Sequence, residues 1–383
     1  MLTPLKKIYY IANVRMPTER AHGLQLAKMC EAFTEKGIEV VLIVPRKKNN
    51  IEKNPKDFYG LRKPLKVISL WNINIFPKSS IGFNINSFSF ALSYFFYLFF
   101  MKKEKGSAIY TIDLDQFSFF LAPFLGLPIF FEVHGSKKKN MFNSFFFKRV
   151  SRFIAVSSKI REKLIEVFDL PPEKVIVKPN GIDFSLFEKI PAKFEARREI
   201  NLPENRTILL YIGKFYDWKG LDIFLDVALN FQSTFFYFVG GTEAELLAAT
   251  GKKVLPQNVF APGYKSHKEI PLWLSAADYL IISGTKKNQY SYEETSPMKL
   301  FEYMASKRPI IAARTPAIET IGGDSEFIFY EPDDAEDLEK TLLAVLPRKN
   351  AADDRIANSY KKALELSWER RAEAIIDFVN KKL

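Results

Sequence analysis

The feature that most constrains the fold is a strand–helix–strand pattern near the start of the chain. Lys6–Asn13 reads as a buried strand, Gly23–Lys36 as an amphipathic helix and Ile38–Val44 as a second buried strand. Two strands joined by a helix within about forty residues form a βαβ unit, whose strands run parallel. The chain is therefore expected to build a parallel sheet covered by helices.

The same alternation continues through the sequence in two rounds. The first predicts further strands at 67–70, 108–112, 128–133, 153–156 and 174–178, with helices at 88–101, 116–125 and 158–168. The second predicts strands at 207–212, 235–239, 259, 279–283, 309–313 and 327–330, with helices at 221–231 and 270–277, after 296, from 335 and from 367. Pro179-Asn180-Gly181 is a strong turn signal between them. We predict two doubly wound α/β halves, residues 1–182 and 183–366.

Composition fits two globular domains. The chain has 383 residues, of which 47% are hydrophobic and 26% charged, a balance that supports large cores. Its one cysteine, Cys30, excludes an intramolecular disulfide, and the first residues show no secretory signal. A reducing cytoplasm is therefore the expected location.

The net charge of +12 is unevenly distributed. Residues 1–180 hold 29 Lys and Arg against 14 Asp and Glu, a net +15, whereas residues 181–383 hold 27 against 30, a net −3. A basic half suits nucleic acid, anionic lipid or an acidic substrate. The alternative is a Lys-rich surface that only keeps the protein soluble.

One aromatic segment raises the question of a membrane. Phe88–Met101 is apolar and is followed by Lys102, Lys103 and Lys105. Its roughly 14 residues are fewer than the roughly 20 needed to span a bilayer. We expect a buried helix, with contact to a membrane surface as the alternative. Any membrane association should therefore be peripheral.

The stretch ETSPMKLFEYMASKRP reads as a loop that turns into a helix. Ser296 suits the helix N-cap and Pro297 the first helical position. Such an N-terminus offers free backbone N–H groups and a positive dipole end to a phosphate, with backbone around Met298. Glu294 and Glu302 flank it and could accept hydroxyl groups of a sugar nucleotide. The alternative is an ordinary amphipathic helix with polar residues outside.

A second candidate is the loop GKFYDWKG after the strand 207–212. Ligands of α/β proteins bind at the carboxyl ends of parallel strands, where Gly213 begins this loop. Lys214 and Lys219 could neutralise a diphosphate there. The alternative is a solvated loop with both lysines directed outward.

The three histidines carry less information. His134 follows a strand at its carboxyl end, and His22 lies beside Gly23 in the loop after the first strand. A lone histidine is more often structural than catalytic. His267 is expected at the exposed start of a helix.

Several functional classes have no support in the sequence. Asp113-Leu114-Asp115 matches the Asp-x-Asp pattern of some metal-binding transferases, but no further ligand cluster supports it, so we read it as a cap and a turn. No GxGxxG or Walker loop follows a strand, and no GxSxG is present. One cysteine and three histidines exclude a Cys/His zinc site in practice.

Several stretches together carry a family resemblance: VRMPTERAHGLQLAKMCEAF, FEVHG, AVSSKIREKL, VIVKPNGID, LLYIGKFYDWKGLDIFLDVA, FVGG and EETSPMKLFEYMASKRPIIAA. Over nearly its whole length the chain resembles glycosyltransferase family 4, the retaining group of the GT-B fold. The resemblance implies an α/β architecture of two Rossmann-like, doubly wound domains facing across a cleft. Residues 1–182, joined by a C-terminal helix of about 367–383, would bind the acceptor, and residues 183–366 the donor.

The resemblance also implies roles for residues in the second half. Lys214 and Lys219 would hold the donor diphosphate, Lys214 in place of a more usual arginine. Glu294 and Glu302, the family's E-x7-E pair, would bind hydroxyls of the transferred sugar and of the ribose. Backbone around Ser296, Pro297 and Met298 would complete the phosphate site, beside Gly213.

In the first half, the resemblance implies that His134 contacts the sugar at the reaction centre. His22 and Gly23 fall where the family has a glycine loop near donor and acceptor. The chain departs from the family at two places. Thr-Ser-Pro follows Glu294 where a glycine-rich run is common, and Lys307 stands where a glycine is common.

The implied activity is transfer of a hexose-type sugar from a nucleoside diphosphate sugar, with retained anomeric configuration and without a metal or other cofactor. The acceptor would be lipid-linked or an anionic glycan of the cell surface, reached in the cytoplasm or at the inner face of the membrane, with no nucleic acid partner. The alternatives are a sugar-nucleotide epimerase of the same fold and a non-catalytic sugar-nucleotide or polyanion-binding protein.

Overall fold

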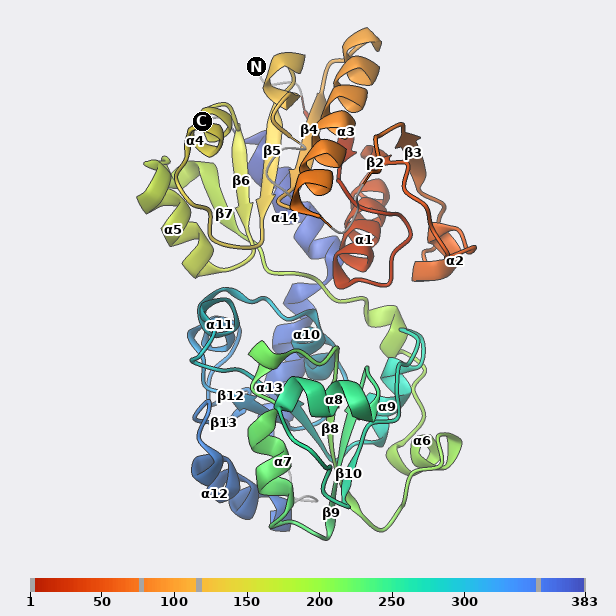
Figure 1. Cartoon of the computed structure of the whole chain (residues 1–383), viewed down its shortest axis with the longest axis vertical. Helices are drawn as coiled ribbons and strands as arrows, with labels where there is room; N and C mark the ends of the chain where they lie inside the picture. Colours follow the sequence, from red (N-terminus) through yellow and green to blue (C-terminus); the bar gives the residue numbers. More distant parts are fainter. Residues whose placement is uncertain (1–3, 76–78, 115–118, 349–352, 382–383) are drawn as a thin grey trace. The chain divides into compact units, whose positions relative to one another are not determined.

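The computed structural model describes residues 4–75, 79–114, 119–348 and 353–381 and divides the chain into two compact units (Figure 1). Unit 1 comprises Met1–Asn180 and Trp368–Leu383, and unit 2 comprises Gly181–Ser367. The chain thus leaves unit 1 after Asn180 and returns to it at Trp368. The boundaries predicted from the sequence were after residue 182 and at about residue 367.

The sheet of unit 1 is parallel, with the order β3-β2-β1-β4-β5-β6-β7 in its described part. Its strands are β1 (Lys7–Ile11), β2 (Glu39–Pro45), β3 (Lys66–Leu70), β4 (Ser107–Ile112), β5 (Ile129–Val133), β6 (Arg152–Ala155) and β7 (Val175–Val177). Continuous runs of β-branched and aromatic residues, buried on both sides, favour such strands. The parallel α/β prediction is therefore confirmed for this half.

The helices of unit 1 are α1 (Ala21–Glu35), α2 (Pro55–Tyr59), α3 (Ser80–Phe100), α4 (Met141–Phe147), α5 (Ser158–Phe168) and α14 (Trp368–Asn380), with short 3₁₀ helices η1 (Ala122–Leu125) and η2 (Pro172–Lys174). Helix α3 begins at Ser80 rather than at residue 88, because the Ser79 side chain caps it by accepting from the Gly82 N–H. The prediction of a helix at 116–125 is wrong for residues 119–125, which contain only the short η1. Residues 116–118 lie outside the described residues.

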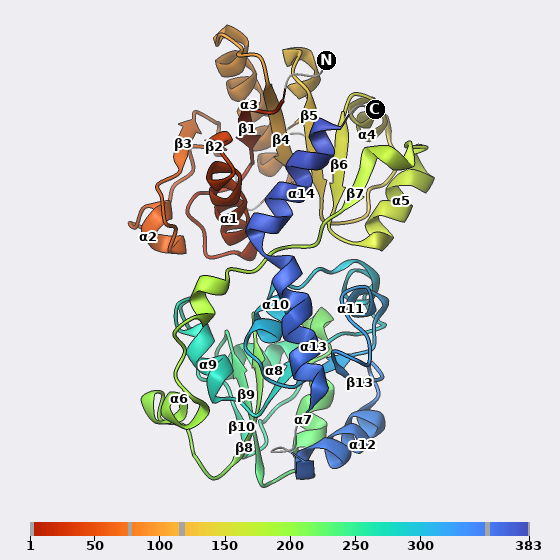
Figure 2. The same cartoon turned by 180° about the vertical axis from the view of Figure 1, so that it is seen from behind.

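Alternate residues of each strand in unit 1 face opposite sides of the sheet. On one side, a core cluster joins the strands to α3, α4 and α5. On the other side, Tyr10 and Tyr110 pack with ring centroids 4.8 Å apart, and Phe33 of α1 meets Tyr110 at 5.5 Å. Helix α14 packs beside α1 on this second side (Figure 2). The last helix of the chain is therefore part of the first half.

Unit 2 repeats the plan, and its described part holds a parallel sheet with the order β10-β9-β8-β11-β12-β13. The strands are β8 (Thr207–Ile212), β9 (Thr234–Val239), β10 (Val259–Phe260), β11 (Tyr279–Ile282), β12 (Ile310–Ala313) and β13 (Ile328–Tyr330). The helices are α6 (Lys193–Glu199), α7 (Asp222–Ala228), α8 (Glu243–Thr250), α9 (Ile270–Ala276), α10 (Met298–Ala305), α11 (Pro316–Glu319), α12 (Ala335–Val345) and α13 (Asp354–Ala363).

Two core clusters cover the two faces of this sheet. One contains residues of α9 and α10, and the other contains residues of α7 and α12. Helices on both faces of a parallel sheet define the doubly wound arrangement. Within the described ranges, no helix combines the length and the apolar character needed to cross a bilayer.

Candidate functional site

The start of α10 differs from the sequence prediction. The helix begins at Met298 with Pro297 as its N-cap, so the predictions that Ser296 caps it and that Pro297 is its first helical residue are wrong. The cause lies upstream, where Tyr290–Glu294 form a π-helical turn and Thr295 leaves it in an extended conformation. Pro297 has no side-chain acceptor for the first N–H groups of the helix. The Leu300 N–H donates to the Pro297 carbonyl at 2.9 Å. The N–H groups before it point out of the start of the helix, as they do at helix N-termini that bind anions.

The loop after β8 is held close to this helix. The Tyr303 hydroxyl of α10 accepts from the Ile212 N–H at 2.7 Å, at the last residue of the strand. Gly213 follows with φ +144°, and a Cβ on Gly240 would lie 2.6 Å from the Gly213 carbonyl oxygen. The carboxyl ends of β8 and β9 thus approach so closely that glycine is required there.

Two lysines gather at this point, and one of them was not predicted. The Lys299 Nζ, on the first turn of α10, lies 3.6 Å from the centroid of the Tyr211 ring. A Cβ on Gly213 would lie 3.5 Å from the same Nζ. The Lys219 Nζ lies 3.9 Å from the centroid of the Trp218 ring. Within the described residues, neither ammonium group has a carboxylate at ion-pair distance.

These lysines are electrostatically strained. Burial lowers the pKa of Lys219 to about 8. Burial, and then the charge of Lys219, hold the pKa of Lys299 well below its usual value. Lys299 also stands at the positive end of the α10 dipole, where a cation is disfavoured. A bound dianion would relieve all three effects at once.

Aromatic side chains connect the Lys219 loop to the segment that carries Glu294. Trp218 stacks on Tyr216 at 5.3 Å and meets Tyr290 edge-on at 5.7 Å. Glu294 closes the π-helical turn and is buried. Lys214, on the same loop, lies with its Nζ 5.8 Å from the Tyr264 ring centroid. The structure thus brings the predicted lysine loop and the Glu294 turn together.

Glu302 has a partner that the sequence did not reveal. His267 lies in the turn before α9, half-buried, with its Nε2 2.9 Å from the Glu302 Oε1. The prediction of an exposed His267 is therefore wrong. Since Glu302 remains partly accessible, with 17% of its side chain exposed, one oxygen is held while the carboxylate still meets solvent.

In unit 1, His134 is held by a buried carboxylate. Its Nε2 lies 2.7 Å from the Oε1 of Glu132, which is fully buried. Arg371 of α14 reaches the same oxygen at 2.9 Å, and the Tyr110 hydroxyl donates to the other. Burial alone would raise the pKa of Glu132, but the charge of Arg371 and then the His134 hydrogen bond lower it to about 2.

This arrangement sets the tautomer of His134. An ionised carboxylate only accepts hydrogen bonds, so the Nε2 of His134 must carry the proton. The Nδ1 is then the ring nitrogen that remains for a ligand. The His134 backbone N–H donates to Asp113 at 3.0 Å, and the Lys137 ammonium lies 2.7 Å from the same oxygen. Asp113 therefore positions the His134 segment rather than capping a helix; Asp115 lies outside the described residues.

His22 and Gly23 lie in the first turn of α1, so the sequence placed Gly23 correctly in this helix and His22 wrongly in the loop before it. Gly23 is required by packing, because a Cβ there would lie 2.3 Å from the Tyr59 hydroxyl, which holds the preceding loop by accepting from the Thr18 N–H. Burial, and then the charges of Arg20 and His134, lower the pKa of His22 to about 4. His22 is therefore neutral at pH 7 and lies within electrostatic reach of His134.

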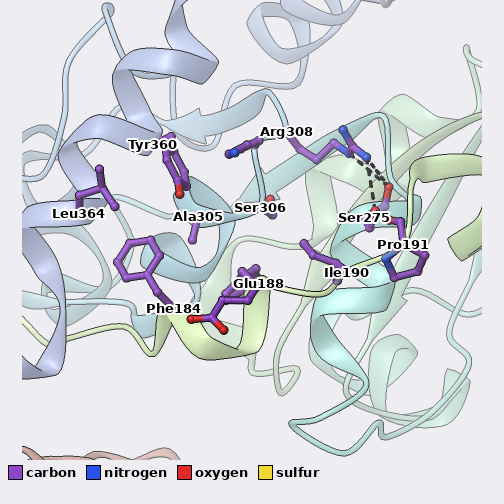
Figure 3. Close-up of a pocket in the computed structure, with 12 residues that line it drawn as sticks. Phe184, Glu188, Ile190, Pro191, Ser275, Ala305, Ser306, Arg308, Tyr360 and Leu364 are labelled. Carbon is purple, nitrogen blue, oxygen red and sulfur yellow. Dashed lines mark hydrogen bonds between the residues drawn. The ribbon is translucent and has the colours of Figure 1, made fainter.

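A pocket of about 470 Å³ lies elsewhere in unit 2, at the opposite end of α10. Ser306 and Arg308 line it with Tyr360 of α13 and Phe184, and the Arg308 guanidinium donates to the Ser275 carbonyl at 2.8 Å (Figure 3). None of the predicted site residues lines this pocket. It is a crevice between α10, α13 and the segment that enters unit 2, and not the predicted donor site.

Of the residues in these clusters that the sequence reasoning missed, Glu132 and Lys299 each carried a signal. Glu132 is the charged residue of an otherwise apolar strand, and it stands two positions before His134, on the same face. Lys299 is a cation in the first turn of a helix, where charge and dipole conflict. Both signals are local conflicts, and such conflicts are expected at functional sites.

Comparison with known proteins agrees with this architecture. A family model described as "Glycosyltransferase Family 4" matches residues 24–186, and one described as "Glycosyl transferases group 1" matches residues 192–362. The processive diacylglycerol alpha-glucosyltransferase of Acholeplasma laidlawii is 25% identical over 243 residues, which cover 60% of this chain and 70% of that protein. Matches to several other curated relatives span about half of their length or less.

Solved structures share the fold. Sucrose-phosphate synthase from Thermosynechococcus elongatus superposes with a TM-score of 0.74 at 18% identity, covering 97% of both chains. HepE from Anabaena, in complex with UDP and glucose, superposes with a TM-score of 0.71 at 16% identity, covering 98% of this chain and 100% of that one. With a family model on each of its two parallel-sheet units, the chain belongs to the group 1 glycosyltransferases and is a GT-B enzyme of the family 4 type.

Proposed function

We propose that this glycosyltransferase moves a hexose-type sugar from a nucleoside diphosphate sugar to an acceptor, with retention of anomeric configuration, in the synthesis of a cell-surface glycan or glycolipid. The observation that carries the donor assignment is the pair Lys219 and Lys299, two half-buried cations at an uncapped helix N-terminus without a described carboxylate partner. Buried charges are normally paired. A diphosphate supplies the missing negative charge.

The proposed roles follow from position. Lys214, Lys219 and Lys299 hold the diphosphate with the backbone from Gly213 and from Ser296, Pro297 and Met298. Glu302, held by His267, accepts from the ribose hydroxyls. Glu294, which the Thr-Ser-Pro sequence follows, accepts from hydroxyls of the transferred sugar.

In the reaction, the bond between the anomeric carbon and the diphosphate oxygen breaks, and the diphosphate keeps the electron pair. The acceptor oxygen forms the new bond to the anomeric carbon, and its proton passes to the departing diphosphate. Fixed cations and N–H groups stabilise the charge that grows on the diphosphate, which is the largest contribution expected in such a site. In unit 1, we propose that His134 contacts the sugar through its Nδ1, with His22 and Gly23 near donor and acceptor.

We propose that lysines take the part that a metal ion takes in other transferases, so that no metal or other cofactor is required. The proposed acceptor is lipid-linked or an anionic glycan. The diacylglycerol glucosyltransferase relative supports a lipid, as does the basic charge of residues 1–180. The enzyme would then work in the cytoplasm at the inner face of the membrane.

The test is release of nucleoside diphosphate from a panel of sugar nucleotides, with and without acceptor. Lys219→Ala and Glu294→Ala should each lower kcat/KM by about 100-fold or more, whereas Lys253→Ala, an exposed lysine of the same unit, should not. Turnover should survive EDTA. Wild-type rates in both site variants would contradict the assignment, and reversible loss of turnover on chelation would contradict metal independence.

The same assay separates the alternatives. A sugar-nucleotide epimerase of this fold converts the donor without an acceptor, whereas a transferase requires both substrates. A non-catalytic binding protein would bind the donor and release no diphosphate.

A further inference from the structure

Helix α3 exposes an apolar face that the fold of unit 1 does not use. Its 21 residues contain no charged side chain. Seven large apolar side chains are exposed, up to 79% for Phe100 and 73% for Ile81; the others are Phe83, Phe88, Leu92, Phe96 and Phe99. At 3.6 residues per turn, all of these positions except Phe83 fall within a sector of about 120°. They form one stripe along the helix.

The opposite side of α3 is the one that packs. Phe90, Ala91, Tyr94 and Leu98 are buried against the sheet, and α3 stands in front of that sheet in Figure 1. Packing in the core of unit 1 therefore explains why the buried side of α3 is apolar, but it does not explain the apolar residues on the exposed side. A contiguous exposed apolar surface of this kind marks an interaction site.

The patch continues beyond the helix. η1 packs against α3, and its Phe124, 56% exposed, stacks on Phe145 of α4 with ring centroids 5.8 Å apart. Met141 and Phe142 of α4 are exposed as well. We call these residues, with the α3 stripe, the aromatic face.

The charges that border the aromatic face are mostly positive. Lys102 and Lys105 follow α3 and are exposed, while Lys103 donates to the Leu125 carbonyl at the end of η1. Exposed Lys138, Lys139, Lys148 and Arg149 flank α4. The one carboxylate in the segment after α3, Glu104, is paired with Lys7 at 3.0 Å. An aromatic surface with a cationic border complements the phosphates and acyl chains of an anionic bilayer.

We propose that the aromatic face rests on an anionic membrane surface, with its rings at the boundary between headgroups and acyl chains and its lysines on lipid phosphates. This inference deepens the proposed lipid-linked acceptor, because it names the surface that brings unit 1 to the lipid. Vesicle binding needs neither donor nor turnover, so the failure of this proposal and the failure of the proposed activity can be told apart.

The experiment is sedimentation of the full chain with vesicles of phosphatidylglycerol and phosphatidylcholine, and with phosphatidylcholine alone. The wild-type protein should bind the anionic vesicles at low salt, and more weakly as salt rises. Phe88→Ser/Phe96→Ser/Phe100→Ser should lower the partition coefficient by about tenfold or more, since each ring loses its apolar burial. Lys102→Gln/Lys105→Gln should weaken binding to anionic vesicles only.

The matched control replaces three exposed apolar residues of unit 2, Leu229→Ser/Leu343→Ser/Val254→Ser, which are exposed by 57%, 59% and 78%. It should bind like the wild type. Unchanged thermal unfolding and donor turnover in the triple phenylalanine variant would show that its loss is specific. Absence of wild-type binding, or equal binding by that variant, would overturn the proposal. The proposal would also be overturned if the wild-type protein were a dimer and the triple phenylalanine variant were a monomer that binds vesicles as the wild type does.

Discussion

At the scale of single residues, the donor site is defined by charges that the free protein does not compensate. Lys219 is predicted from its loop by sequence alone, because a lysine after a parallel strand is a known arrangement for phosphate. Lys299 could not be predicted in this way, because the helical pattern shows only that it follows Met298 and precedes Leu300 on the same helix. What makes it part of the site is its approach to Gly213 and Tyr211, which depends on how α10 packs on β8. Tertiary contacts of this kind leave no periodic pattern.

This charge arrangement predicts that donor binding takes up protons. In the free protein, burial lowers the pKa of Lys219 to about 8 and holds that of Lys299 well below its usual value. A bound diphosphate favours both ammonium forms and raises both pKa values. Affinity for a nucleoside diphosphate should therefore be highest below pH 8 and fall as the pH rises through 8.

Calorimetric titration in buffers of different ionisation enthalpy measures the proton uptake directly. At pH 8 the wild-type protein should take up protons on binding, and Lys299→Met should take up fewer. Lys253→Met, in the same unit and exposed, serves as the control. Binding with no proton exchange between pH 7.5 and 9 would contradict this charge assignment.

At the scale of elements, long apolar or amphipathic runs could be predicted, whereas some of the short helices could not. Thr207–Ile212 and Ser158–Phe168 have the bounds that the sequence predicted. Helix α8 was missed, because eight residues are too few for a clear periodicity. Its N-terminus nevertheless carries a capping box, in which the Thr242 N–H donates to the Glu245 side chain at 2.7 Å, a signal that Thr-x-x-Glu alone provides.

The end of α10 carries strain that can be measured. Lys307 follows the helix with φ +57°, a left-handed conformation that favours glycine. A non-glycine residue pays about 1–2 kcal/mol there. The Lys307 Nζ lies 4.4 Å from the Tyr360 ring centroid, which offsets part of the strain.

Comparing Lys307→Gly with Lys307→Ala separates these effects, because both variants lose the cation–π contact and only glycine removes the strain. The glycine variant should be more stable by about 1 kcal/mol in urea unfolding. At Ser306, which has φ −75°, the order should reverse, with alanine above glycine. The same order at both positions would contradict the strain at Lys307.

At the scale of the whole molecule, the alternation of strands and helices was enough to predict two parallel α/β units. It was not enough to predict what holds α14 in unit 1. Arg371 of α14 binds Glu132 and also donates to the Pro179 carbonyl at 2.8 Å. One side chain thus ties the last helix to the His134 segment and to the end of the first half. A buried ion pair between residues 239 positions apart is invisible to local patterns.

This network predicts acid sensitivity of unit 1 in two steps. Burial lowers the pKa of His22 in the folded protein to about 4, from an ordinary value of 6.5. Between these values the unfolded chain binds a proton that the folded chain does not, so stability falls as the pH drops from 6.5 toward 4. Against the effect of burial, the charge of Arg371 lowers the pKa of Glu132 in the folded protein to about 2, from an ordinary value of 4.5. By the same reasoning it lowers stability further, by about 1.4 kcal/mol per pH unit below 4.5.

Hydrogen exchange of the full chain, followed in the peptide that contains β5, reports this loss locally. Protection there should decrease between pH 4.5 and 3 after correction for intrinsic exchange. Glu132→Gln should remove that acid step yet destabilise unit 1 at pH 7 by about 3–5 kcal/mol, because Arg371 is left buried without a counter-charge. Glu132→Gln/Arg371→Met should recover part of this loss, since it removes both charges. If the double variant were as unstable as the sum of the two single variants, the two side chains would not act as a pair, and α14 would have to be held in unit 1 by its apolar contacts alone.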